Sequence, residues 1–98
     1  LNIKVPIIIH GFNKNEELGE QLLAKGFWLS FGEAVLNKKS SLVKLIQKTD
    51  NFFLETDDSG NSIEEIYHAV AYLKKCTINE LKARIFANFK KLNLHKNH

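Results

Sequence analysis

Three short apolar runs alternate with segments of helical spacing, and this alternation restricts the fold of the 98-residue chain more than any other feature. The runs are 5–9 (VPIII), 27–31 (FWLSF) and 52–54 (FFL). Helices are expected at about 15–25 and 40–48, and after the capping-box patterns Ser62-x-x-Glu65 and Thr77-x-x-Glu80. The order β-α-β-α-β-α-α predicts parallel strands with right-handed crossovers, which is an α/β architecture.

The apolar residues indicate which surfaces are buried. The β-branched run with Pro6 near its start is typical of a fully buried parallel strand, and the run 52–54 is apolar enough for burial on both faces. Gly26 just after the first helical segment predicts a C-terminal cap. The expected core faces of the helices are Leu18, Leu22 and Leu23 in the first, Ile63, Ile66 and Val70 in the third, and Ile78, Leu81, Ile85 and Phe89 in the fourth.

Three parallel strands alone leave two long unpaired edges. Folding about a hundred residues costs on the order of 100 to 200 kcal/mol of conformational entropy, while a fully buried large apolar side chain returns about 1.5 to 3 kcal/mol. We therefore expect a partner that completes the sheet. The chain starts with Leu1 and contains no methionine, so we expect residues 1–98 to be a single partial domain of a longer protein, with a flexible tail at 93–98.

Composition sets broad limits on function. The chain is 44% hydrophobic and 26% charged with a net charge of +3, as in an ordinary globular domain. Cys76 has no partner for an internal disulfide, which suits a reducing compartment. No apolar run approaches the roughly 18 residues of a membrane span, and no signal-peptide pattern is present at the start. We expect a cytoplasmic protein.

Polar residues with the chemistry of a metal site stand at the ends of two strands. In parallel α/β folds, catalytic groups lie just beyond the carboxyl ends of the strands, and His10 and Asp57 occupy that position on the first and third strands. Imidazole and carboxylate groups are ligands for divalent metals. Two other interpretations remain open: His10 as a hydrogen-bonded loop residue, and the sequence ETDD (55–58) as a solvated turn before the next helix.

Several motifs, in order along the chain, resemble the TatD family of metal-dependent deoxyribonucleases. That family has a His-Cys-Phe-Ser-Gly motif after one strand, then a Gly-Phe-aromatic-x-Ser-Phe strand, a Glu-Thr-Asp motif, and an Asn-hydrophobic-basic pattern in a last helix. The matching residues here are His10 and Phe12; Gly26, Phe27, Trp28, Ser30 and Phe31; Glu55, Thr56 and Asp57; and Asn88 and Phe89. The resemblance implies that the chain forms the sixth to eighth strands of a TIM (β/α)8 barrel.

The resemblance also implies roles for individual residues. His10 would be a metal ligand, and Asp57 both a ligand and the group that orients or deprotonates the attacking water. Glu55, two residues before Asp57, should point to the same face and is a candidate partner of a ligand. The cofactors would be divalent ions, Mg, Mn or Zn. The substrate would be DNA or another phosphodiester, with no indication of which residues bind it.

The chain departs from the family pattern at three positions. Gly11 stands where the family has cysteine, Asn13 where it has serine, and Asp58-Ser59 where it has Ser-Pro, which leaves the shape of the substrate loops open. The other family ligands belong to an amino-terminal half, so we expect the 98 residues alone to be inactive. The alternative is a small α/β interaction module without a metal, with weak affinity for nucleic acid through Lys38, Lys39, Lys90 and Lys91.

Overall fold

A computed structural model describes residues 6–56 and 62–96, with side chains as far as Leu92 in the last helix. It contains three strands, β1 (Ile8–Ile9), β2 (Trp28–Phe31) and β3 (Phe52–Leu54). The helices are α1 (Glu16–Ala24), α2 (Leu42–Lys48), α3 (Ile63–Lys74) and α4 (Ile78–Lys96), with a 3₁₀ helix, η1 (Glu33–Leu36), after β2. The expected order of strands and α-helices is therefore confirmed.

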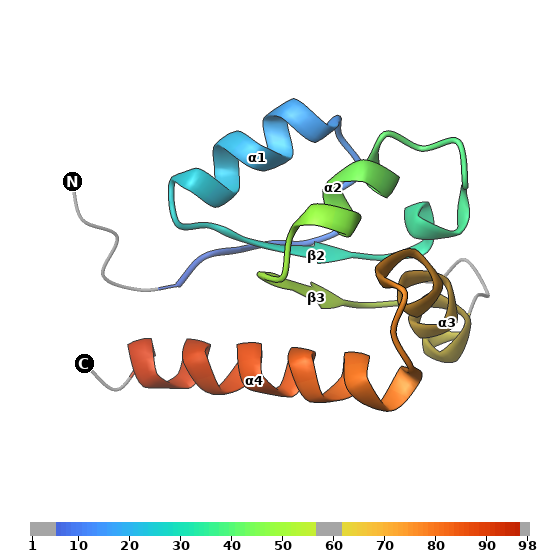
Figure 1. The fold of residues 1–98 in the computed structure, drawn as a ribbon. Helices are drawn as coiled ribbons and strands as arrows, with labels where there is room; N and C mark the ends of the chain where they lie inside the picture. Colours follow the sequence, from blue (N-terminus) through green and yellow to red (C-terminus); the bar gives the residue numbers. More distant parts are fainter. Residues whose placement is uncertain (1–5, 57–61, 97–98) are drawn as a thin grey trace.

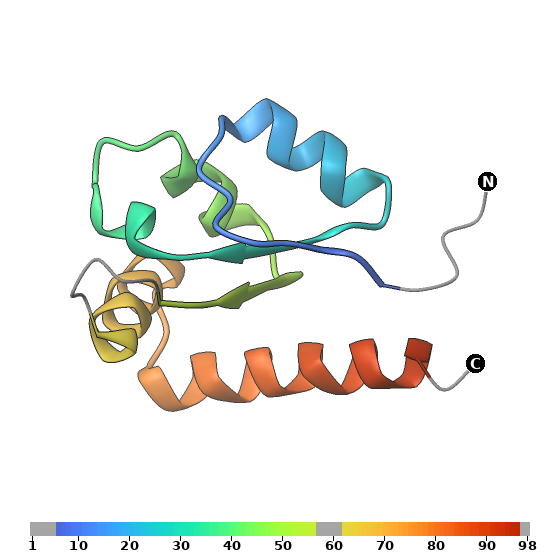
Figure 2. The ribbon, with the colours of Figure 1, turned by 180° about the vertical axis from the view of Figure 1, so that it is seen from behind.

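The strands form one parallel sheet in the order β1-β2-β3. Figures 1 and 2 show α1 and α2 on one side of the sheet, α3 beside the carboxyl ends of the strands, and α4 running back along β3. After β1 and after β2, a helical connection brings the chain back to the end of the sheet where the next strand begins, as parallel pairing requires. The carboxyl ends of all three strands therefore share one edge of the molecule.

The core lies between the sheet and its helices. Alternation of side chains places Leu29, Phe31 and Phe52 on the face toward the helices, where each is at most 2% exposed. The helices contribute the buried residues Leu42, Leu45, Ile46, Ile66, Val70, Ala71 and Leu81, and η1 contributes Val35. On the opposite face, Trp28 and Phe53 pack together with ring centroids 5.4 Å apart.

The helix ends follow the capping signals of the sequence. Asn15 caps α1, because its side chain accepts a hydrogen bond from the Leu18 amide, and the Ser62–Glu65 capping box at the start of α3 is complete. After α1, Gly26 has a φ of +92° and donates its N–H to the Leu23 carbonyl. Glycine adopts this left-handed conformation without steric cost, so the predicted C-terminal cap is confirmed.

One buried amide attaches α4 to the outer edge of β3. The Asn88 side chain, 4% exposed as a residue, donates through Nδ2 to the carbonyls of Asp50 at 2.6 Å and Phe52 at 3.0 Å. Glu55 gives its N–H to Phe31 in β2, so by alternation the carbonyls of Asp50 and Phe52 point away from β2. Asn88 therefore satisfies acceptors at an edge that has no neighbouring strand among the described residues.

Several expectations about burial and strand extent were wrong. In the first strand, only Ile8–Ile9 are paired as strand residues; they are half-buried, and Ile7 is 39% exposed, because no described strand covers the other edge of β1. Its first residue, Val5, lies outside the described residues. Of the third strand only Phe52 is fully buried. Phe89, expected in the core, is 51% exposed, and Leu18 and Ile63, also expected on core faces, are each 39% exposed. Helix α4 extends to Lys96. The flexibility expected for residues 93–98 stays a prediction.

Of the helices described, none combines the length and the apolar character that crossing a membrane requires.

Candidate functional site

His10 and Glu55 meet at the carboxyl end of the sheet. The Nδ1 atom of His10 lies 2.9 Å from Oε1 of Glu55, although the two residues are 45 positions apart in the sequence. The His10 side chain is 72% exposed and that of Glu55 28%. The imidazole is therefore open to solvent while its carboxylate partner is mostly covered.

The sheet register explains why these two residues meet. His10 follows β1 and Glu55 follows β3, and both share the side-chain face of Trp28 and Phe53. Gly32 follows β2, the strand between them. A Cβ atom at Gly32 would lie 3.7 Å from Cγ of Glu55, so a longer side chain there would compete for the space that the carboxylate uses.

The hydrogen bond determines which nitrogen of His10 is available. An ionised carboxylate only accepts hydrogen bonds, so Nδ1 of His10 carries the hydrogen and donates it to Glu55. In the neutral imidazole, Nε2 then keeps its lone pair. Histidines that bind metals generally donate their other ring N–H to a carboxylate or carbonyl in this way. The pair fits a metal ligand with its supporting carboxylate, and it equally fits a base held in one orientation.

A cavity of about 340 Å³ lies beside this pair. Its lining includes Gly11, Phe12, Asn13, Gly32, Glu33, Ala34, Glu55 and Thr56. Gly11 and Asn13, two of the departures from the family motif, therefore border this space. Gly11 has a φ of +61°, which a glycine tolerates better than the cysteine of the family motif. The sequence reasoning missed Glu33, although Gly32-Glu33 directly follows an apolar strand and thus satisfies the same strand-end rule.

The proposed metal site is only partly visible. Asp57, the expected ligand and catalytic residue, lies outside the described residues, as does Asp58. Within residues 6–56 and 62–92, whose side chains are described, no three His, Cys, Asp or Glu side chains are grouped closely enough to hold a metal ion. The described residues therefore supply one histidine with a suitable free nitrogen, and its partner carboxylate.

The lysines of the alternative interpretation do not form one cluster. Lys38 and Lys39 follow η1, whereas Lys90 and Lys91 lie in the second half of α4. All four are exposed. The ammonium group of Lys90 lies 4.7 Å from the centroid of the Phe86 ring, and Lys91 borders a separate groove between helices.

Comparison with solved structures identifies the architecture. The chain superposes on a hydrolase TatD family protein from Entamoeba histolytica with a TM-score of 0.70 over 89% of its length, at 14% sequence identity. The fold is a TIM-barrel segment. The expected fold class, a three-strand parallel sheet of such a barrel with surrounding helices, is thus confirmed.

The structural match covers only part of the Entamoeba protein, and no match of sequence accompanies it. The chain spans 42% of the length of the Entamoeba protein. Neither the family models nor the curated proteins give a match to this sequence.

Proposed function

We propose that this chain is part of a metal-dependent hydrolase that cleaves phosphodiester bonds, with DNA as the substrate class. The observation that carries the proposal is the His10–Glu55 hydrogen bond at the carboxyl end of a TIM-barrel segment. This end is where barrel enzymes place their catalytic groups. The overall likeness to a TatD family hydrolase and the motif resemblance at His10, Glu55 and Asp57 support the same assignment.

Each residue has a separate part in the proposal. His10 would bind a divalent ion through Nε2, and Glu55 would hold the imidazole ring in that orientation. Asp57 would be the second ligand and would accept a proton from the attacking water. A divalent ion bound there, Mg, Mn or Zn, would lower the pKa of its bound water and polarise a phosphoryl oxygen of the substrate.

The proposal includes a partner for the sheet. A typical (β/α)8 barrel has about 250 residues, so the rest of the barrel would have to supply the remaining ligands. Two ligands do not hold a catalytic metal pair, and the 98 residues alone should therefore not hydrolyse DNA. The second face of the sheet, with Trp28 and the half-buried Phe53, would then lie in the barrel interior.

The test is Asp57→Asn in the complete protein that contains this chain. The amide keeps the shape of the side chain but loses the charge that binds the cation and accepts the proton. Cleavage of a labelled oligonucleotide with added Mg²⁺ or Mn²⁺ should fall at least about a hundredfold, the lower end of a general-base contribution. Asp58→Asn is the matched control and should change the rate little.

A second substitution tests the orienting role of Glu55. Glu55→Gln can still accept a hydrogen bond from Nδ1 of His10 but lacks the negative charge, so Mn²⁺ affinity should fall by about 10- to 100-fold. Calorimetric titration with Mn²⁺ measures this without reference to catalysis.

If Asp57→Asn keeps more than half of the wild-type cleavage rate, the assignment of Asp57 is wrong and the ETDD segment is a solvated turn.

A further inference from the structure

An apolar pocket lies where η1, α2 and α3 pack against one another. It has a volume of about 540 Å³, which is within the range of about 300 to 1,000 Å³ that is typical of small-molecule sites. The residues that line it include five apolar ones, Val35, Leu36, Val43, Ala69 and Leu73, and three with polar groups, Lys38, His68 and Tyr72. Mostly apolar walls with a few polar groups are the usual composition of such sites.

Buried neighbours hold the walls of the pocket in place. Val35 is 3% exposed and anchors η1 in the core, while Leu42 in α2 and Val70 in α3 are fully buried. The Lys74 ammonium group donates to the Thr49 carbonyl at 2.7 Å, which joins the end of α3 to the end of α2. Because helices packed on the core form the apolar walls, the pocket does not have to be built when a ligand binds.

Three polar side chains at the exposed edge of the pocket are available to a ligand. Lys38 and His68 are exposed, and Tyr72 is 78% exposed. Among residues 6–56 and 62–92, none of these three side chains has a hydrogen-bond or ionic partner. An ammonium group, an imidazole N–H and a phenol O–H can each donate a hydrogen bond.

The charge at the pocket has one sign. Among the described residues that line it, one is a cation, Lys38, and none is an acid. A ligand with a negative group would therefore find hydrogen-bond donors and an opposite charge at the edge, with no carboxylate to repel it. A ligand with an amine would be repelled by Lys38 and would leave the donors without acceptors.

The pocket is separate from the candidate catalytic site. The first half of η1, Glu33 and Ala34, borders the cavity beside Glu55, whereas the second half, Val35 and Leu36, borders the apolar pocket. The described residues that line the two spaces are all different. An inference about the apolar pocket is therefore independent of the proposed hydrolase activity.

We propose that this pocket binds an aliphatic carboxylate of medium chain length, with its carboxylate at Lys38 and Tyr72 and its hydrocarbon chain on the apolar walls. A carboxylate only accepts hydrogen bonds, so it matches a set of donors. Its hydrogen bonds are roughly twice as strong as those of a neutral alcohol, because the acceptor is charged. The hydrocarbon chain supplies the rest of the affinity by leaving water.

The test is equilibrium dialysis of radiolabelled decanoate against the complete protein that contains these residues, at concentrations below those at which decanoate forms micelles. We expect saturable binding. The affinity should rise about two- to fourfold for each CH₂ group added between hexanoate and decanoate, since full burial of one CH₂ group corresponds to about fourfold. An affinity that does not depend on chain length would contradict the use of the apolar walls.

One pair of variants tests the place of binding. Ala69→Leu puts a larger side chain into the pocket and should weaken decanoate binding about tenfold, because it displaces about two CH₂ groups of the ligand. Ala83→Leu makes the same change at an exposed position of α4 outside the pocket and should leave the affinity within about twofold. Circular dichroism checks that both variants are folded.

A second set of variants tests the role of the donors. Lys38→Gln should weaken decanoate binding about three- to tenfold and leave the binding of decanol unchanged, since decanol has no charge. Lys39→Gln removes an equal charge from the next residue, which is outside the pocket, and should leave the decanoate affinity within about twofold. Tyr72→Phe removes one hydrogen bond and should weaken binding about threefold.

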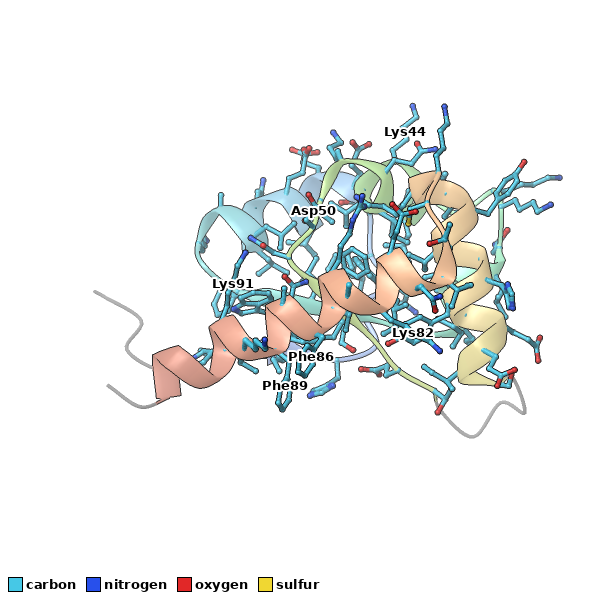
Figure 3. The ribbon with its side chains drawn as sticks, turned by 60° about the horizontal axis from the view of Figure 1, so that its bottom comes forward. Lys44, Asp50, Lys82, Phe86, Phe89 and Lys91 are labelled. Atoms are coloured by element: carbon cyan, nitrogen blue, oxygen red, sulfur yellow. The ribbon has the colours of Figure 1, made fainter. Side chains whose placement is uncertain are left out.

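Several results would overturn the proposal. Equal affinity for decyltrimethylammonium, which has the same chain and a positive charge, would mean that binding ignores the donors. Phe86 and Phe89 are 59% and 51% exposed, and they lie with Lys82 on one side of α4, outside the pocket (Figure 3). Decanoate binding that is unchanged by Ala69→Leu would place the ligand on such an exposed surface instead.

Two further outcomes separate this proposal from others. A protein dimer that Ala69→Leu dissociates, without any binding of decanoate, would make a second copy of the chain the occupant of the pocket and would refute a carboxylate ligand. Asp57→Asn should leave decanoate binding unchanged, so failure of the hydrolase assignment and failure of this proposal are distinguishable.

Discussion

Asn88 offers the sharpest test of how this three-strand sheet is stabilised. Its amide is buried and donates to two carbonyls on the outer edge of β3, Asp50 at 2.6 Å and Phe52 at 3.0 Å. A typical hydrogen bond contributes about 0.5 to 1.5 kcal/mol net, and a buried acceptor left without a partner costs about 1 to 3 kcal/mol. The bond to Phe52 is buried, whereas the Asp50 carbonyl is partly accessible and can recover a water molecule.

Asn88→Ala should therefore destabilise the folded chain by about 2 to 4 kcal/mol. A domain of this size has only about 5 to 15 kcal/mol of stability in total, so the effect is large. Equilibrium unfolding in urea, followed by circular dichroism, should show a midpoint lowered by more than about 1 M. The transition must be independent of protein concentration, so that association does not contribute.

Two further variants define the cause of this loss. Asn79→Ala makes the same change at an exposed position of α4 and should leave the free energy of unfolding within about 0.5 kcal/mol of wild type. Asn88→Asp should be worse than Asn88→Ala at pH 7, because a carboxylate would face two carbonyls, and should improve as the pH falls and the new group is protonated. A loss below about 0.5 kcal/mol for Asn88→Ala would refute the reasoning.

Three other predictions concern packing, pH and association. Gly19→Ala should destabilise the chain by about 1 to 3 kcal/mol in the same urea assay, because the new methyl group would clash with Leu45. This clash should outweigh the better helix propensity of alanine. A stabilised variant would show that Leu45 can move aside. Hydrogen bonds from the Thr77 backbone and side chain lower the pKa of Glu80 in the folded chain. The stability that Glu80 contributes is therefore present above the pKa of the unfolded state, and it is lost as the pH falls through the lower pKa of the folded state. Glu80→Gln should thus flatten the urea midpoint against pH between about 5 and 2, and an unchanged slope would contradict this. The chain alone should associate or bind a hydrophobic dye through the exposed Phe86 and Phe89 of α4 and through the open sheet edges. A monodisperse monomer in light scattering that also binds no dye would contradict this prediction.

The order of the elements could be predicted because its signals are local. The capping box at Ser62 and Glu65 forms as the sequence indicates, and Gly26 ends the first helix as expected. The 3₁₀ helix at Glu33–Leu36 was missed, because a single short turn carries no periodicity. The burial of the strand that became Ile8–Ile9 was also misjudged, because burial depends on what covers an edge and not on the strand's own residues.

The candidate site was predictable in part. The strand-end rule selected His10 and Asp57 from their positions after apolar runs, and it would have selected Glu33 had it been applied after the second run. Glu55 was named only as a candidate partner of a ligand. The direct contact between Nδ1 of His10 and Glu55 depends on the register of three strands and on the small residue Gly32 between them. Asp57 lies outside the described residues, so its role stays a prediction from its strand-end position and the resemblance.

The sequence by itself determined the α/β class, since periodicity and capping act within a few residues of the chain. Only the tertiary structure decided which polar groups work together. Asn88 and Asp50 are 38 positions apart, and nothing in their local sequences indicates that an amide from the last helix closes the edge of the third strand. Likewise, Lys74 and Lys91 belong to different helices, and only the packing of α2, α3 and α4 places both of them beside one groove. Such long-range meetings depend on how whole elements pack, because packing, unlike helix formation, is not specified by neighbouring residues.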